Sequence, residues 1–228
     1  MSQPSAEAVE TLQTRCCIAG GGPAGMVLGF LLARAGVDVV VLEKHGDFLR
    51  DFRGDTIHPS TLEVMYELGL LDEFLKRSHQ EARVITGFVG DVAIPVADFT
   101  HLRTHCRFIA FMPQWDFLDF LARQAAAYPT FRLQMRAEAT DLIRDGDRVV
   151  GLSATTPDGP MHVRADLVVA ADGRHSVLRE RAGLPADVYG APMDVLWFRL
   201  PRSPDDPTTA MGRFDTGRIF IMLNRGES

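Results

Sequence analysis

The segment from Cys16 to Lys44, CCIAGGGPAGMVLGFLLARAGVDVVVLEK, constrains the fold more than any other part of the sequence. An apolar run is followed by a glycine-rich turn, a helical stretch with Pro23 at its start and Gly36 at its end, and a second apolar run. The two apolar runs are continuous rather than alternating, which is typical of parallel strands covered on both faces. The segment therefore predicts a strand–helix–strand unit and, with it, an α/β fold built on a parallel sheet.

The turn of this unit carries the spacing Gly20-x-Gly22-x-x-Gly25. Gly20 permits a tight turn, Gly22 lets the backbone approach a pyrophosphate, and Gly25 lets the helix pack closely on the strand. The helix N-terminus adds unpaired N–H groups and a partial positive charge. Glu43 ends the second strand, where a carboxylate accepts hydrogen bonds from the adenosine ribose. The pattern predicts a dinucleotide site, and by itself it does not separate FAD from NAD.

A second candidate nucleotide turn lies far along the chain, in DLVVAADGRHSVLRE (166–180). An apolar run leads to Asp172-Gly173, and a short basic helix follows. Upstream, Asp145-Gly146 and Asp158-Gly159 are hairpin turn signals, so we expect a β-meander to lead into this run. Taken alone, the Asp-Gly turn is only a modest indication of a phosphate site.

Composition and charge narrow the class of protein. The chain has 228 residues and a formal net charge of −6, which argues against a nucleic-acid partner. No segment has the length and apolar character of a membrane span, and the N-terminus lacks a signal-peptide pattern. Cys16, Cys17 and Cys106 have no metal-ligand spacing, and His101 and His105 have no accompanying carboxylate set. We therefore expect buried, reduced thiols, no metal, and a cytoplasmic protein.

Four separated segments resemble one enzyme family in the family's own order. They are AGGGPAGMVLGFLLARAGVDVVVLEK (19–44), FRGDTIHPSTLEVMYELGLLDEF (52–74), MPQWDFLDFLARQA (112–125) and VVAADGRHSVLRERAG (168–183). Together they are similar to the FAD-dependent aromatic hydroxylases, the para-hydroxybenzoate hydroxylase-like flavin monooxygenases. The resemblance favours FAD over NAD as the bound dinucleotide.

The resemblance implies a set of FAD-binding positions. Glu43 matches the ribose ligand and Lys44 sits beside it near the adenosine. Arg53 matches the arginine of a loop along the cofactor, and Gln114 matches a helix residue at the ribityl–pyrophosphate region. The backbone of Ala139 matches the adenine contact, and Asp172 with Gly173 matches the second nucleotide motif. The pyrophosphate loop is matched by Gly20, Gly22, Pro23, Ala24 and Gly25.

The resemblance also implies the chemistry. In this family NAD(P)H reduces the flavin, O₂ adds at C4a, and the resulting hydroperoxide hydroxylates an electron-rich aromatic or polyketide-like small molecule. The flavin carries the reaction, so no side chain is assigned as catalytic. Two alternatives stay open: an FAD oxidoreductase that does not hydroxylate, such as a reductase or a halogenase, and a non-catalytic FAD-binding remnant. The tryptophan-rich WxWxIP signature of flavin halogenases is absent.

The predicted architecture is a Rossmann-like, GR2-type FAD-binding domain, with a parallel sheet and β-meander, plus the start of a mixed β-sheet substrate domain. A loose N-terminal arm covers 1–14. The FAD-binding domain covers 15–83 and 107–185, and the partial substrate domain covers 84–106 and 186–228.

Members of the resembled family continue beyond the last motif matched here. They complete the substrate sheet and add a Gly-Asp-Ala motif and a closing helix, none of which occurs in this sequence. MDVLWFRLP (193–201) and RIFIMLNR (218–225) are expected to be strands that begin this sheet. We therefore expect a truncated form or a fragment, with strand edges that invite pairing with another chain, a homo-oligomer included.

Overall fold

The computed structural model of the chain describes residues 9–49, 55–198, 200–201, 203, 205 and 211–223. The chain forms two compact units. Unit 1 comprises Met1–Leu49 and Leu118–Pro192, and unit 2 comprises Arg50–Phe117 and Met193–Ser228. These bounds differ from the predicted domains, because 55–83 and 107–117, predicted to belong to the FAD-binding domain, lie in unit 2. The assignment of FAD binding to one domain and substrate binding to the other stays a prediction.

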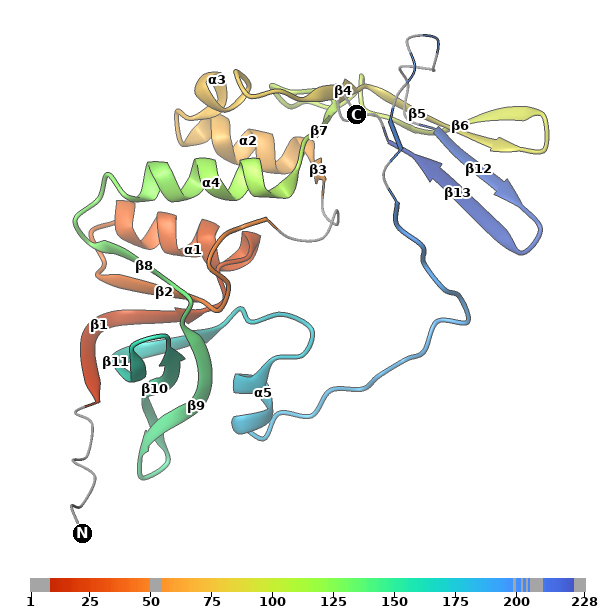
Figure 1. Cartoon of the computed structure of the whole chain (residues 1–228). Coiled ribbons are helices and arrows are strands. Elements are labelled where there is room, and N and C mark those ends of the chain that lie inside the picture. The colour runs from red at the N-terminus through yellow and green to blue at the C-terminus, as the bar shows by residue number, and fades with distance from the viewer. Residues whose placement is uncertain are drawn as a thin grey trace. The chain divides into compact units, whose positions relative to one another are not determined.

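Unit 1 is built on a six-stranded sheet with the order β8-β2-β1-β11-β10-β9. The strands β8 (Phe131–Met135), β2 (Val39–Glu43), β1 (Glu10–Ala19) and β11 (Gly159–Ala170) are parallel to one another. β10 (Arg148–Thr156) and β9 (Glu138–Asp145) follow in antiparallel pairing. The α/β class, with a parallel sheet extended by a β-meander, is confirmed. Figure 1 shows α1 (Pro23–Arg34) lying over the strands β8, β2 and β1.

β2 and the end of β1 are apolar and are covered on both faces. All of β2 and the last four residues of β1 are buried. Helix α1 sits close to the sheet at two glycines. A Cβ on Gly29 would lie 2.7 Å from Val41 Cγ2, and one on Gly25 would lie 3.3 Å from Ile18 Cγ2. Gly29 is a second close-packing position that the nucleotide-loop spacing does not include.

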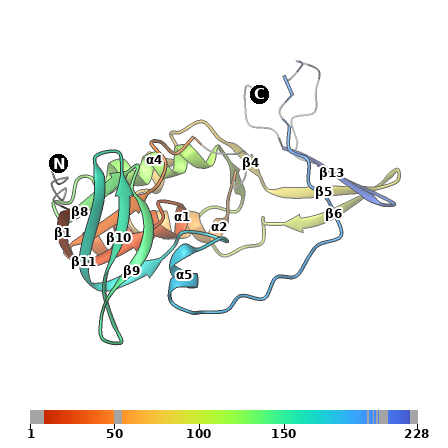
Figure 2. The ribbon, with the colours of Figure 1, turned by 60° about the horizontal axis from the view of Figure 1, so that its bottom comes forward.

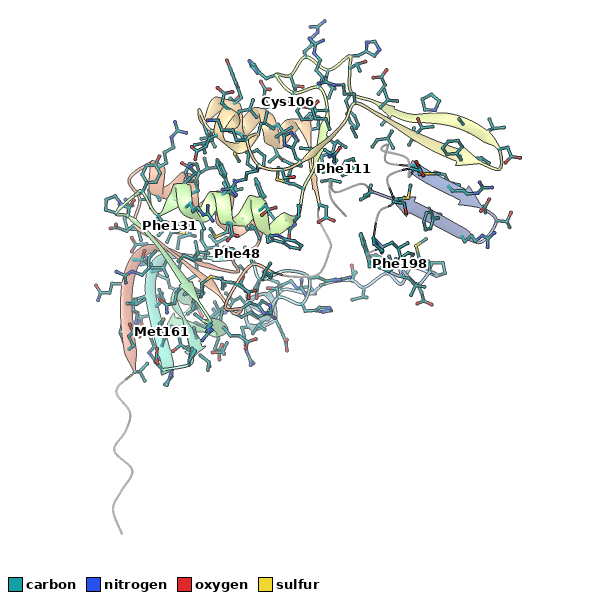
Figure 3. All side chains as sticks on the ribbon, turned by 45° about the horizontal axis from the view of Figure 1, so that its top comes forward. Phe48, Cys106, Phe111, Phe131, Met161 and Phe198 are labelled. Carbon is teal, nitrogen blue, oxygen red and sulfur yellow. The ribbon has the colours of Figure 1, made fainter. Side chains whose placement is uncertain are left out.

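The meander encloses the other part of the core of unit 1. Its two turns follow Asp145 and Thr156, as the Asp-Gly signals predicted, and Figure 2 shows the hairpin of β9 and β10 beside α5 (Val177–Arg181). Buried side chains of β1, β2, β10, β11 and α5 form one cluster there. Met161 of β11, labelled in Figure 3, is among its fully buried members.

The predicted N-terminal arm is wrong for its last five residues. β1 begins at Glu10, which pairs with Met161 of β11, so residues 10–14 form a strand. Their side chains are exposed or half-buried, and a polar sequence gives little sign of such a strand. What stabilises it is the backbone of β11, which is distant in the sequence. Residues 1–8 lie outside the described part of the chain.

The described residues of unit 2 form two small sheets, two short helices and the first turn of a third helix. A three-stranded sheet has the order β3 (Thr56–Ile57), β7 (Ile109–Phe111), β4 (Gln80–Ala82), with antiparallel pairing. The helices are α2 (Pro59–Glu67) and α3 (Leu71–Phe74), separated at Gly69 as predicted. Phe111, labelled in Figure 3, packs with Ala82 and Ile109 in a small core. Helix α4 (Gln114–Ala125) runs across the boundary between the two units.

The second sheet of unit 2 has the order β13 (Arg218–Met222), β12 (Met211–Asp215), β5 (Val84–Val89), β6 (Val92–Asp98). It joins the insert predicted at 84–106 to the C-terminal segment, because β12 pairs in parallel with β5. One of its faces is apolar and exposed: Val89, Val92, Ile94, Val96, Phe214, Ile219 and Ile221.

The predicted strand in 193–201 is wrong for the described residues. Residues 194–198 form no strand, although they are apolar enough to suggest one. Val195, Leu196 and Trp197 are 64%, 83% and 49% exposed, so the described residues leave much of their apolar surface uncovered. A strand requires a hydrogen-bonded neighbour as well as suitable side chains. Among the helices of the described residues, none combines the length and apolar character needed to cross a membrane.

Candidate nucleotide-binding site

The loop between β1 and α1, Gly20 to Gly25, is a tight turn held at both ends. The Gly20 N–H donates to the Leu42 carbonyl over 2.8 Å, which ties the loop to the end of β2. Gly22 is the N-cap of α1, and the Met26 N–H donates back to its carbonyl over 2.9 Å. Pro23 occupies the first turn, where a missing N–H costs nothing. The sequence-predicted loop is therefore a strand-to-helix turn at the carboxyl end of the parallel sheet.

Gly20 brings the two predicted nucleotide motifs together. Its φ is +107°, and a Cβ there would lie 2.6 Å from the Ala171 carbonyl carbon and 2.9 Å from the Asp172 nitrogen. The Ala171 N–H donates to the Ala19 carbonyl over 2.8 Å. The peptide just before Asp172-Gly173 thus packs directly on the first glycine loop, because β1 and β11 are neighbours in the sheet.

Glu43 holds the glycine loop through backbone hydrogen bonds to its buried carboxylate. Its side chain is 2% exposed, Oε2 accepts the Gly21 N–H over 2.9 Å, and Oε1 accepts the His45 N–H over 2.9 Å. Gly21 is close enough that a Cβ would lie 2.9 Å from the Glu43 Cβ. Sequence reasoning missed Gly21, which stands at a variable position of the glycine spacing. Lys44, which follows Glu43, is exposed.

Gly22 faces open space. A Cβ added there would meet no heavy atom within 4 Å, and its backbone is extended. The neighbouring first-turn N–H groups of α1 have no acceptor inside the helix, as at every helix start. Open space in front of a helix N-terminus suits an anion such as a pyrophosphate. The residues present therefore fit the phosphate end of a dinucleotide.

The Asp172 turn caps the short helix that follows it. Asp172 Oδ2 accepts the Leu178 N–H over 3.2 Å, and Ser176 Oγ accepts the Arg179 N–H over 3.0 Å. Arg179 Nη2 donates to the Arg174 carbonyl over 3.1 Å, which links the helix to the loop that precedes it. Asp172 Oδ1 is buried and has no hydrogen-bond partner among the described residues. Gly173 is exposed beside it.

The remaining predicted positions are placed as follows. Ala24 lies in the first turn of α1 beside Pro23 and Gly25, and Ala139 lies on β9 opposite Ala154 of β10. Gln114 is the first residue of α4, is half-buried, and belongs to unit 2. Arg53 lies outside the described residues. The structure therefore brings together Gly20 to Gly25, Glu43 and the Asp172 turn, all within unit 1.

His105, for which the sequence gives no metal-ligand pattern, pairs with Glu63. Its Nδ1 lies 2.9 Å from Glu63 Oε1, its backbone N–H donates to Glu63 Oε2 over 2.9 Å, and its ring stacks on Tyr66. These hydrogen bonds, first the backbone one and then that of the ring, lower the pKa of Glu63. In the described ranges no group of three or more His, Cys, Asp or Glu side chains is arranged to hold a metal ion.

Comparison with known proteins agrees with this geometry. The model of the FAD binding domain family matches residues 13–225. The chain is 30% identical over 188 residues to 6-methylpretetramide 4-monooxygenase of Streptomyces rimosus, covering 82% of this chain and 45% of that protein. It is 34% identical over 167 residues to rifampicin monooxygenase of Streptomyces venezuelae, covering 73% of this chain and 33% of that protein. The chain thus spans less than half the length of these curated relatives.

Among solved structures, p-nitrophenol 4-monooxygenase PnpA from Pseudomonas putida DLL-E4 matches with a TM-score of 0.67 at 26% identity, covering 77% of this chain and 44% of that chain. The PqsL mutant of Pseudomonas aeruginosa matches with a TM-score of 0.75 at 20% identity, covering 94% of this chain and 58% of that chain, and shows the fold alone. The fold and the family-model match lead to one conclusion: the chain belongs to the FAD binding domain family.

Proposed function

We propose that this chain is the FAD-binding part of a monooxygenase that uses NAD(P)H and O₂ to hydroxylate an aromatic or polyketide-like small molecule. The observation that carries the proposal is the packing of Gly20 on the Ala171–Asp172 peptide, which makes one site of two motifs. Relatives named as monooxygenases of 6-methylpretetramide and rifampicin support the reaction and the kind of substrate.

In this proposal the FAD pyrophosphate lies in front of Gly22, at the positive end of α1. Pro23, Ala24 and Gly25 form the first turn that faces it. Glu43 accepts the Gly21 N–H through one oxygen and the His45 N–H through the other, and in this proposal it also binds the adenosine ribose. When bound, FAD supplies the redox chemistry, taking electrons from NAD(P)H and activating O₂.

Other residues are proposed to line the rest of the cofactor. Lys44 lies next to the adenosine, and the backbone of Ala139 contacts the adenine. Arg53 and Gln114 lie along the ribityl and pyrophosphate groups. Asp172 holds its turn through Leu178, so that the exposed backbone at Gly173 faces FAD or NAD(P)H phosphates. No side chain is assigned a proton-transfer step.

A direct test is to titrate the purified chain with FAD and follow flavin fluorescence. We expect saturable binding, and we expect Gly22→Ala to weaken it by at least about tenfold with only a small loss of thermal stability, since the new methyl meets no heavy atom within 4 Å and alanine is only a poorer N-cap than glycine. Gly190→Ala is the matched control, because a Cβ there also meets no heavy atom within 4 Å and its φ is not in the left-handed region. A wild-type chain that never binds FAD would contradict the proposal.

Hydroxylation itself needs a separate readout. With NAD(P)H, O₂ and a candidate phenol or polyketide, an oxygenated product supports the monooxygenase, whereas NAD(P)H oxidation without such a product supports an oxidoreductase that does not hydroxylate. FAD that binds but is never reduced supports a non-catalytic remnant. The assay is run on this chain and on any longer polypeptide that contains it, because the matched part of the chain covers only 45% and 33% of these relatives.

Two further proposals concern association with another polypeptide and the cellular compartment. The edge strands β6 and β13 support pairing with another polypeptide, a second copy included, which light scattering after gel filtration measures. Cys16, Cys17 and Cys106 are free and buried, which supports a reducing, cytoplasmic compartment.

A further inference from the structure

Arg136 has a backbone conformation that its residue type rarely adopts. Its φ is +56°, and it is the one non-glycine residue with a positive φ in the part of the chain that is described. Left-handed backbone at a long side chain is strained, and such positions gather at ligand sites. A glycine would adopt this conformation more readily, so the local backbone does not explain an arginine here.

The backbone around Arg136 is already held without its side chain. The chain passes from β8 to β9 across the carboxyl end of β2, although those strands lie at opposite edges of the sheet. There the Arg136 N–H donates to the His45 carbonyl over 3.0 Å, and the Ala137 N–H donates to the Glu43 carbonyl over 2.9 Å. Any residue other than proline at 136 could make the first of these bonds.

The side chain of Arg136 lies over the loop that follows Glu43. A Cβ on Gly46 would lie 2.8 Å from the Arg136 Nε, so the guanidinium covers that glycine. Arg136 is exposed, and among the described residues no carboxylate or carbonyl is recorded as a partner of its guanidinium. Lys44 and His45 follow β2 at the strand end to which the Arg136 backbone is hydrogen-bonded, and their side chains are exposed as well.

We propose that Arg136 binds the adenosine end of FAD, with its guanidinium plane against the adenine ring. The inference rests on the proposed function, which places the adenosine ribose at Glu43. Arg136 reaches the same strand end through the Ala137–Glu43 and Arg136–His45 hydrogen bonds. A planar, weakly hydrated cation stacks well on an aromatic ring, and an exposed guanidinium without a protein partner is available for it.

Two variants remove the contact in different ways. Arg136→Gln deletes the cation and keeps a non-glycine residue at the same φ. Gly46→Ala keeps the arginine, and its new methyl displaces the flexible guanidinium, at an ordinary φ where alanine is tolerated. We expect each variant to raise the Kd for FAD, by about tenfold for Arg136→Gln. Combining them should add nothing further, because both act on one contact.

Controls separate this role from a structural one. Arg148→Gln removes an exposed arginine at the start of β10 and should leave FAD affinity unchanged. FMN, which lacks the adenosine, should bind all variants as it binds the wild type. Arg136→Gly should weaken FAD binding while its thermal midpoint stays equal to or above that of the wild type, which a purely structural arginine would not do.

The possible results separate a failure of the inference about Arg136 from a failure of the proposed function. If the wild type binds FAD and both Arg136→Gln and Gly46→Ala bind it equally well, the inference about Arg136 is wrong and the proposed function stands. Additive losses in the double variant would also overturn the inference. If the wild type binds no FAD, the proposed function fails, and the inference fails with it.

Discussion

Glu43 accepts a hydrogen bond from the backbone N–H of Gly21, with 2.9 Å between Oε2 and nitrogen. The residue predicted as a ribose ligand therefore also holds the glycine loop in the protein itself. Its other oxygen accepts the His45 N–H, so one buried carboxylate satisfies two backbone donors from two loops. Buried donors left without an acceptor are costly, which gives Glu43 a structural effect that is separable from ligand binding.

Glu43→Ala should destabilise the protein in the absence of any flavin. Two N–H groups lose their acceptor, and each such loss costs about 1–3 kcal/mol, so we expect a total of about 2–6 kcal/mol. Glu43→Gln keeps one acceptor oxygen and should lose about half as much. Urea unfolding measures the change, with Glu138→Gln on exposed β9 as the control. An alanine variant as stable as the wild type would show that these two hydrogen bonds contribute little.

Gly20→Ala should destabilise the protein far more than Gly36→Ala. Both glycines have positive φ, at +107° and +77°, so both substitutions carry the strain of about 1–2 kcal/mol. Only at Gly20 does the new methyl also meet the Ala171–Asp172 backbone, which cannot rotate away. We expect urea unfolding to show a modest loss of unfolding free energy for Gly36→Ala. Gly20→Ala should be grossly destabilised or insoluble. Equal losses would contradict the close packing of the two motifs.

Asp172→Ala and Ser176→Ala should each loosen the start of α5. Each removes a side-chain acceptor for a first-turn N–H, at a cost of about 1 kcal/mol. Asp172→Asn keeps an acceptor oxygen and should preserve most of the stability. Asp147→Ala, in the exposed β9–β10 turn, is the matched control. Chemical denaturation checks the order, and an asparagine variant as unstable as the alanine variant would argue against the cap.

Stability in unit 2 should fall as Glu63 is protonated. Hydrogen bonds from His105 lower the pKa of Glu63 below its ordinary value of 4.5. A carboxylate whose pKa is lower in the folded state stabilises that state above its unfolded pKa. That stabilisation is lost as the pH falls through the folded pKa. We expect thermal midpoints of the wild type and Glu63→Gln to converge below about pH 4.

Glu67→Gln, on the same helix and exposed, is the control for this pH dependence. It should retain the wild-type loss of stability in acid. If Glu63→Gln shows the same acid profile as the wild type, the Glu63–His105 pair does not contribute to it.

Cys17 should resist alkylation in the folded protein. Its side chain is fully buried, and that burial raises its pKa to about 12, with a smaller contribution from Cys16. The reactive thiolate is therefore scarce at pH 8 and the reagent has no access. Iodoacetamide labelling followed by mass spectrometry should detect Cys17 only in urea. Labelling at equal rates with and without urea, in protein that remains folded, would be the contrary result.

The parts of the fold that the sequence predicts well are those that local patterns determine. Continuous apolar runs predicted β1 and β2, and glycine with proline marked both ends of α1. The Asp-Gly pairs located the meander turns. In each case the side chains of one short segment carry the signal, because burial on both faces or a positive φ restricts which residues fit.

Features that depend on distant partners could not be predicted in this way. The polar start of β1 is a strand only because β11 supplies its hydrogen bonds, and 194–198 is no strand because its side chains are largely exposed and it has no strand neighbour among the described residues. The same limit applies to the site. The sequence identified Asp172 by motif, and its use as the cap of Leu178 depends on how the turn folds back. Arg136 carried no signal at all, since a single residue type does not reveal its φ.

The pairing of β1 with β11 has a consequence for how the protein is made. During synthesis, the chain from Glu10 to Glu43 emerges early and can assemble β1, α1 and β2, but the peptide that backs Gly20 follows β11. Contacts of such long sequence separation form late and slow folding. A nascent chain that has not yet extended past Asp172 therefore carries the glycine loop without its support. The ability to retain a nucleotide should arise abruptly as that segment leaves the ribosome.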